Sequence, residues 1–158
     1  RGLLLVRRVL GDLAIDLAAT KVTELKTGPT SLDGVVVSTG DDRLGSLNFA
    51  TFALAAPEWR ANLSANYRFD RHNIRLGVNY VSAVHDERAG KQYGEDGEDW
   101  VTADATYRFQ FSDDLALTAT IANIFDRDPP AAQEELGYDP FMGNPLGRTI
   151  ELGVKKAF

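Results

Sequence analysis

The sequence of 158 residues contains no cysteine, and no apolar run in it approaches the roughly 18 residues that cross a membrane as a helix. Without cysteine the chain forms no disulfides and no thiolate metal sites. Basic residues are in deficit, since 17 Lys and Arg stand against 23 Asp and Glu, and this net charge of −6 argues against nucleic acid as a partner. Membrane strands stay compatible with the composition, because a barrel strand needs only about 9–11 residues with every second one apolar.

Histidine is also scarce, and the sequence shows no catalytic pattern. His72 and His85 are the only histidines, and we expect both to be solvated rather than metal ligands, because neither has a cysteine or a second histidine nearby. The sequence has no Ser/His/Asp set and no glycine loop suited to a phosphate. Carboxylates at 95–99 and at Asp41–Asp42 lack the spacing of a helix–loop–helix calcium site, so solvated loops are favoured, with calcium at 95–99 left open. We therefore predict no enzyme activity, no cofactor and no assigned metal site.

Apolar and polar residues alternate over most of the chain. From Val101 to Phe111 every odd-numbered residue is apolar and every even-numbered one is polar, which is the period of a strand with two different faces. The stretch from Trp59 to Phe69 repeats this pattern. We predict an all-β fold, an antiparallel meander of about six or seven long strands. The expected strands lie near 13–24, 57–69, 73–85, 99–111, 114–125 and 147–158, with a further one at 3–9 where the alternation is poor.

The connections between these strands alternate in length. Tight turns are predicted at Gly11–Asp12, Asp70–Asn73 and Ser112–Asp114, and long connections rich in Gly, Pro and charge span 26–56, 86–99 and 126–146. Short turns at one end and long loops at the other are typical of outer-membrane β-barrels. Every short turn falls on the side where the chain ends, which would be the periplasm, and the long loops would be extracellular.

A soluble β-sandwich also alternates, but two features favour a membrane barrel. The predicted strands run to about 12 residues, beyond the usual five or six. Aromatic residues gather at both strand ends while Ala, Leu and Val fill the middles, as a bilayer with two interfaces selects. We expect the following residues to share the outer, lipid-facing surface: Val101, Ala105, Tyr107, Phe109, Leu117, Ile121, Leu152 and Val154.

The last eight residues, from Glu151 to Phe158, alternate and finish on an aromatic ring. In water such a strand would leave an open sheet edge, whereas in a closed barrel the last strand pairs with the first. The ending resembles the C-terminal assembly signal of bacterial outer-membrane proteins, which the barrel assembly machinery recognises. Glu151, Gly153 and Phe158 match that signal, and Lys156 departs from it where an apolar residue is usual. The resemblance implies the outer membrane of a Gram-negative bacterium.

Residues 57–158 resemble the C-terminal end of a TonB-dependent outer-membrane receptor. These receptors show an Asn-Ile/Leu-Phe-Asp-x-x-Pro-Pro run that closes the penultimate strand, then a Tyr-Asp pair, then a Gly-Arg pair before the last strand. The sequence has all three in this order, preceded by Pro57–Arg60. The motif residues are Asn123, Phe125, Asp126, Pro129, Pro130, Tyr138, Gly147 and Arg148.

This resemblance implies a barrel of about 22 strands with an N-terminal plug domain inside it. It also implies energy-coupled import of a scarce nutrient (siderophore, cobalamin, haem or oligosaccharide) through the TonB complex, which acts on an N-terminal motif. Neither the plug domain nor the N-terminal TonB-contacting motif is in this chain, which opens on Arg1 and has Met142 as its one methionine. We therefore expect residues 1–158 to be the C-terminal part of a barrel wall, with lipid, plug, remaining strands, TonB complex and assembly machinery as partners.

The polar face of the strands would line the barrel lumen or contact the plug, because lumen positions are polar. This set is Arg60, Asn62, Asn66, Arg68, Arg75, Asn79, Asp104 and Arg108. Substrate contact is better sought in the long loops, where aromatic rings offer stacking surfaces. The candidates there are Tyr93, Trp100, Tyr138 and Phe141.

Two other functions remain open from the sequence. A passive porin-like or adhesin-type barrel needs neither a plug nor energy coupling, and the Asn123–Pro130 run favours the receptor over it. An outer-membrane lipase or protease is disfavoured because the catalytic residues are missing. The transported substrate is not readable from the sequence, since specificity lies in the loops and the plug.

Overall fold

The computed structural model of the chain describes residues 2–8, 11–47, 56–86, 97–131, 137–138 and 143–157. Regular secondary structure over these ranges consists of β-strands, which confirms the predicted all-β class. Over the same ranges, no helix is long and apolar enough to span a membrane.

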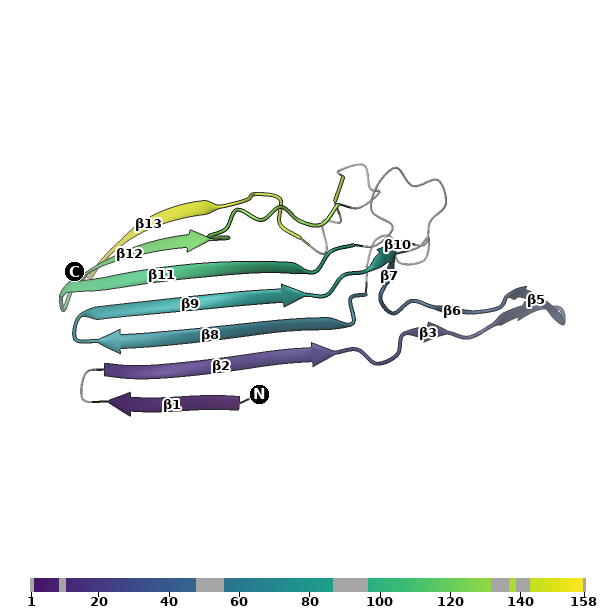
Figure 1. Cartoon of the computed structure of the whole chain (residues 1–158), viewed down its shortest axis with the longest axis horizontal. Coiled ribbons are helices and arrows are strands. Elements are labelled where there is room, and N and C mark those ends of the chain that lie inside the picture. Colours follow the sequence, from purple (N-terminus) through teal and green to yellow (C-terminus); the bar gives the residue numbers. More distant parts are fainter. Residues whose placement is uncertain are drawn as a thin grey trace.

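Seven strands form one antiparallel sheet, in which each strand pairs with the next long strand along the chain (Figure 1). The neighbours follow the order β1-β2-β8-β9-β11-β12-β13, so the predicted meander is confirmed. The strands are β1 Gly2–Arg8, β2 Gly11–Lys21, β8 Trp59–Phe69, β9 His72–Val81, β11 Trp100–Ser112, β12 Leu115–Ala122 and β13 Thr149–Lys156. The strand β11 has 13 residues and β8 has 11, about twice the usual strand length.

The tight turns agree with the prediction at two positions and differ at one. Asp70–Arg71 connects β8 to β9, and Asp113–Asp114 connects β11 to β12, as predicted. Gly11 and Asp12 were wrongly expected to form a turn, because they begin β2, where Gly11 pairs with Arg8. The poorly alternating N-terminal segment does contain a strand, β1.

The strand β12 ends earlier than expected. It stops at Ala122 and not at residue 125, because Asn123 has a φ of 50°, a left-handed conformation that does not continue a strand. Phe125, expected on the strand, lies beyond its end with 73% of its surface exposed.

His72 corrects a third expectation. It is not a solvated turn residue but the first residue of β9, and it is half-buried. Its Nδ1 lies 2.6 Å from the hydroxyl of Tyr107, and its ring centroid lies 4.9 Å from that of Phe109. The imidazole therefore belongs to an aromatic cluster at the turn end of the sheet.

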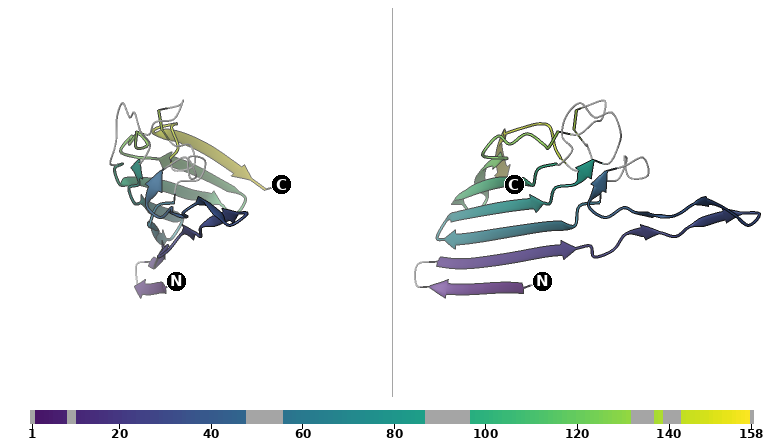
Figure 2. Two further views of the ribbon diagram at one scale, coloured as in Figure 1. Left: turned by 90° about the vertical axis from the view of Figure 1, so that its right-hand side faces the viewer. Right: turned by 45° about the vertical axis from the view of Figure 1, so that its right-hand side comes forward.

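The first long connection forms a narrow β-ribbon rather than an irregular loop over its described part. Its strands are β3 Lys26–Thr27, β4 Thr30–Leu32, β5 Val35–Ser38, β6 Asp41–Asp42 and β7 Ser46–Leu47. The strand β3 pairs with β6 and β4 pairs with β5, so the ribbon extends beyond the end of β2 (Figures 1 and 2). At its tip, Asp33 and Gly34 both have positive φ, which suits a tight hairpin turn. The strand β7 pairs in parallel with β10 His85–Asp86.

One face of the sheet is apolar. Residues directly opposite each other on neighbouring strands share a face, and Phe109 lies opposite Leu117, which lies opposite Val154. Ala105 lies opposite Ile121 in the same way. All eight residues expected to share one surface lie on this face: Val101, Ala105, Tyr107, Phe109, Leu117, Ile121, Leu152 and Val154.

The apolar face is uncovered. Within the described ranges, Val81 and Ala116 are the buried apolar residues, and both lie on the opposite face. On the apolar face, Leu117 is 40% exposed and Leu152 is 80% exposed. The sheet is twisted and remains open between β1 and β13 (Figure 2). Within the described residues the sheet has no hydrophobic core of its own, and none of them covers its apolar face, so a face of this size indicates contact with a further apolar surface.

Candidate functional site

The second face of the sheet is polar and carries hydrogen bonds between side chains of three strands. The amide of Asn62 on β8 donates to Oδ1 of Asn79 on β9 at 2.6 Å. The amide of Asn79 in turn donates to Oδ2 of Asp104 on β11 at 3.0 Å. These three residues form a continuous polar row across the sheet, which we call the polar row.

All eight residues predicted to face the lumen or plug lie on this polar face, although whether that face lines a lumen stays a prediction. They are Arg60, Asn62, Asn66, Arg68, Arg75, Asn79, Asp104 and Arg108. The structure brings three of them together in the polar row, and it links Asn66 to Asn73 by a 3.0 Å hydrogen bond. Arg68 and Arg108 lie with Arg71 around a cavity of about 330 Å³ at the turn end of the sheet.

Asp104 connects the polar row to the family motif. Its Oδ1 accepts a hydrogen bond from the backbone N–H of Asn123 at 2.8 Å, while its Oδ2 holds the Asn79 amide. Asn123 is 7% exposed, so this N–H would cost free energy if it were left without a partner. The carboxylate of Asp104 thus fixes the point at which the chain leaves β12.

The side chain of Asn123 closes a turn with Arg127. Its Oδ1 accepts from the backbone N–H of Arg127 at 3.0 Å, and its Nδ2 donates to the carbonyl of Arg127 at 2.8 Å. The backbone N–H of Asp126 also donates to the carbonyl of Asn123 at 2.9 Å. Asn123 and Asp126 both have positive φ, 50° and 56°, which Asn and Asp tolerate better than other residues with a Cβ. The turn therefore needs these residue types for their backbone as well as for their side chains.

Asp126 joins this turn to the start of the last strand. Its Oδ1 accepts from the backbone N–H of Arg148 at 2.6 Å, and its Oδ2 lies 3.9 Å from the Arg148 guanidinium. Arg148 Nη1 also donates to the carbonyl of Ile124 at 3.3 Å. A Cβ at Gly147 would lie 2.8 Å from Asp126 Oδ1, and Gly147 has a φ of 63°, so a side chain there would be strained and would crowd the Asp126 carboxylate. We call Asn123, Asp126, Gly147 and Arg148 the clasp, because they tie the loop ends of β12 and β13 together.

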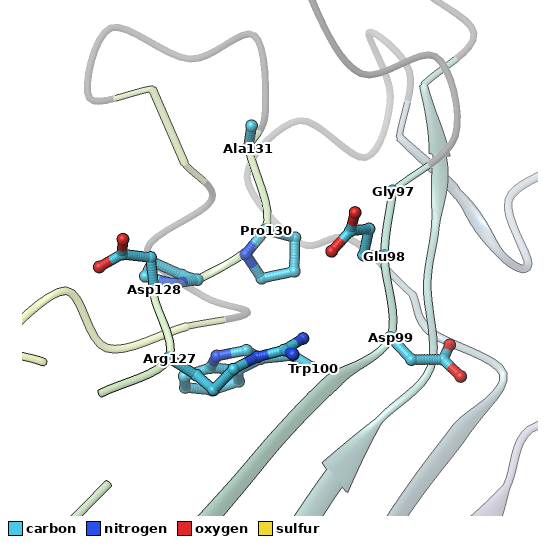
Figure 3. Close-up of a pocket in the computed structure, with 9 residues that line it drawn as sticks. Gly97, Glu98, Asp99, Trp100, Arg127, Asp128, Pro130 and Ala131 are labelled. Carbon is cyan, nitrogen blue, oxygen red and sulfur yellow. The ribbon is translucent and has the colours of Figure 1, made fainter. Parts of the chain in front are cut away.

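A cavity of about 390 Å³ lies beside the clasp, at the loop end of the polar face (Figure 3). It is lined by Gly97, Glu98, Asp99, Trp100, Arg127, Asp128, Pro129, Pro130 and Ala131. Trp100 was expected to offer a stacking surface, and Pro129 and Pro130 belong to the motif. Trp100 lies on the same face as Asp104, since the two are four residues apart on β11. Within the described part of the chain, Nε1 of Trp100 is buried without a hydrogen-bond partner.

Two of the acidic side chains that line this cavity differ in their hydrogen bonds. Asp99 accepts from the hydroxyl of Tyr80 at 3.0 Å and from the backbone N–H of Ala83 at 2.8 Å. Its carboxylate therefore fastens the end of β9. Glu98 is exposed at the rim of the cavity.

The remaining candidates are scattered or lie outside the described residues. Tyr138 forms an isolated bridge with Ala131, and Tyr93, Phe141 and Phe158 lie outside the described residues. Glu151 and Gly153 lie in β13, opposite Thr120 and Thr118. A Cβ at Gly153 would make an ordinary contact, so this structure gives no steric reason for glycine there.

The described residues include no group of three or more His, Cys, Asp or Glu side chains suited to a metal ion. Glu95 and Asp96 lie outside the described residues, so calcium at 95–99 stays an open question. The roles of Asp104 and Arg127 beside the motif were not predicted from the sequence. The sequence signal for these two roles is weak, because the roles depend on which residues of neighbouring strands the sheet register places side by side.

No protein-family model and no curated protein matches the chain, whereas solved structures do. The closed form of the ferric-catecholate import receptor Fiu from Escherichia coli K12 matches with a TM-score of 0.57 and 17% identity, over 94% of this chain and 25% of that one. A G324V mutant of the ferric enterobactin receptor PfeA from Pseudomonas aeruginosa matches with a TM-score of 0.54 and 16% identity, over 99% of this chain and 21% of that one. The chain thus spans a quarter or less of these receptors and has the fold of a portion of a TonB-dependent receptor β-barrel.

Proposed function

We propose that the chain is part of the barrel wall of a TonB-dependent outer-membrane receptor, which imports a scarce nutrient in an energy-coupled step. The observation that carries this proposal is the meander itself, with one exposed apolar face and one hydrogen-bonded polar face. Its match to receptor barrels over almost all of its length supports the same interpretation. The resemblance of the motif and of the C-terminal residues adds an independent reason.

The two faces suit a bilayer on one side and a water-filled lumen on the other. Barrel strands need about 9–11 residues to cross a membrane, and β2, β8 and β11 have 11, 11 and 13. Lipid would cover the apolar face, which includes Leu117 and Leu152. The open edges at β1 and β13 would pair with the other strands of the barrel, so that no edge is left in the membrane.

In this proposal the wall has a positioning role and carries out no chemistry on the nutrient. The polar row would face the plug and the lumen, while the motif would hold the loop ends of the last two strands. Energy would reach the receptor through the TonB complex, which acts on a segment outside this sequence. The two similar structures are receptors for ferric-catecholate and ferric enterobactin, and for this chain the nutrient is open among siderophores, cobalamin, haem and oligosaccharides.

The test is made on the full-length gene product that contains this chain, expressed in a Gram-negative host. We expect it in the outer-membrane fraction as a heat-modifiable barrel, and we expect nutrient uptake that stops when TonB is deleted. Unaltered uptake without TonB would favour the passive porin-like or adhesin-type barrel. Recovery of the folded protein in the soluble fraction would contradict both membrane readings.

A further inference from the structure

The cavity beside the clasp is lined by more acidic than basic residues. We propose that it binds a neutral, polyhydroxylated ligand of the saccharide type and disfavours anionic ligands. This inference rests on the proposed function, because import is what would bring a nutrient to the loop end of the polar face. It names a substrate class that differs from the ferric-catecholate and ferric enterobactin of the two similar receptors.

The first reason is the shape and polarity of the walls. Trp100 supplies a large flat ring and Pro130 a smaller rigid one (Figure 3), and Pro129 also lines the cavity. Binding sites typically combine such apolar walls with a small number of polar groups that fix orientation. A sugar ring fits this combination, since it has C–H faces for apolar contact and hydroxyls around its rim.

The second reason is the mixture of donors and acceptors. Arg127 offers only donors, and the carboxylate of Glu98 offers only acceptors. A hydroxyl both donates and accepts, so one polyol can satisfy both groups at once.

The third reason is charge. The residues that line the cavity include three acidic ones and one basic one, Arg127. The three long connections, 26–56, 86–99 and 126–146, together carry 14 acidic and 5 basic residues, whereas the rest of the chain carries 9 acidic and 12 basic. An anionic ligand that approached the loop end would therefore meet a field of its own sign, which lowers its association rate and its affinity.

A metal cation would suit this charge but not this geometry. Figure 3 shows the carboxylate of Glu98 turned toward Pro130, whereas the carboxylates of Asp99 and Asp128 point away from it on opposite sides. Asp99 is already hydrogen-bonded to Tyr80 and Ala83. The acidic groups thus do not converge on one point, as the oxygen ligands of a cation would have to.

The experiment measures binding to the full-length receptor in detergent micelles by calorimetry. The probes are a panel of short neutral glucans, mannans and xylans and, as the anionic probe, a ferric tris-catecholate complex. We expect at least one neutral oligosaccharide to bind more tightly than the anionic probe. Trp100→Ala should weaken that binding about tenfold or more, as expected for loss of a stacking ring. Trp59→Ala is the matched control, because Trp59 lies at the same end of the sheet but on the apolar face, away from the cavity. Its ring contacts Lys21 on the neighbouring strand.

Glu98→Arg supplies a second variant at an exposed position, which does not endanger folding. It equalises the acidic and basic side chains of the lining, so the anionic probe should bind several-fold more tightly than to the native receptor. The inference is overturned if no oligosaccharide of the panel binds, if the native receptor prefers the anionic probe, or if both tryptophan variants lose equal affinity. Each preparation is also checked for its heat-modifiable form and outer-membrane origin, and failure there overturns the proposed function itself.

Discussion

Substitutions at Asp126 separate the three contributions that this residue makes to the clasp. The Asp126 carboxylate accepts a hydrogen bond from the backbone N–H of Arg148, and hydrogen bonds to charged groups contribute about 1.5–3 kcal/mol. The lower end of this range applies, because the Asp126 side chain is 56% exposed. The ion pair with the Arg148 guanidinium, at 3.9 Å and half-exposed, adds about 0–1 kcal/mol. Alanine at a φ of 56° costs a further 1–2 kcal/mol or so, because its Cβ crowds the backbone.

Three variants resolve these terms. Asp126→Ala loses all of them and should destabilise the full-length receptor by about 2–4 kcal/mol. Asp126→Gly loses the side chain but accepts the positive φ, so about 1–2 kcal/mol is expected. Asp126→Asn keeps an acceptor oxygen and tolerates the backbone, so it should cost below about 1 kcal/mol.

The assay is urea unfolding of the receptor in lipid vesicles, with backbone hydrogen exchange at residues 148–150 as the local readout. Exchange there should accelerate in the order Asn, Gly, Ala. Equal stability of Asp126→Ala and Asp126→Asn within about 0.5 kcal/mol would refute the clasp as an energetic element. Faster exchange confined to β8 and β9 would contradict its location.

Three further predictions concern the two faces and the chain end. Leu117→Arg should cost about 2–4 kcal/mol in lipid vesicles, whereas Thr118→Arg on the polar face should cost much less, and equal losses would argue against a lipid-facing apolar surface. Asn79→Ala removes its hydrogen bonds to Asn62 and Asp104 and should destabilise the receptor by about 1–3 kcal/mol in the same assay, an estimate that a loss below 0.5 kcal/mol or so would contradict. Deletion of Phe158 should lower the amount of heat-modifiable receptor in outer membranes more than it lowers the stability of the folded receptor. Lys156→Tyr should raise that amount. A normal amount of the Phe158 deletion variant at low expression would exclude an assembly role for Phe158.

The sequence predicts the strands well because the period of two is a local property. In β11, from Val101 to Phe111, the odd-numbered residues lie on the apolar face and the even-numbered residues on the polar face. The antiparallel pairing then places the apolar faces of neighbouring strands together. The predicted end of β12 was wrong by three residues, also for a local reason. Alternation does not reveal that Asn123 adopts a left-handed conformation, since Asn is also compatible with a strand.

The polar row was only half predictable. Parity places Asn62, Asn79 and Asp104 on one face, but the register decides that Asn62 lies opposite Asn79. That register depends on a two-residue turn at Asp70–Arg71 rather than the four-residue turn that the sequence suggested. A shift of one residue between β8 and β9 would have placed Asn62 and Asn79 on opposite faces of the sheet.

The cavity could not be predicted at all, because it joins residues 97–100 to residues 127–131 through the course of two loops. The structure explains how such a site becomes rigid. Asp104 holds the N–H of Asn123, and Asn123 holds both the N–H and the carbonyl of Arg127, which lines the cavity. A continuous series of hydrogen bonds therefore leads from the polar row on the strands to the wall of the cavity. Functional groups fixed by such supporting bonds are placed more accurately than groups on a free loop. The motif residues are then explained by the geometry they maintain, and a ligand in the cavity need not touch the clasp in order to depend on it.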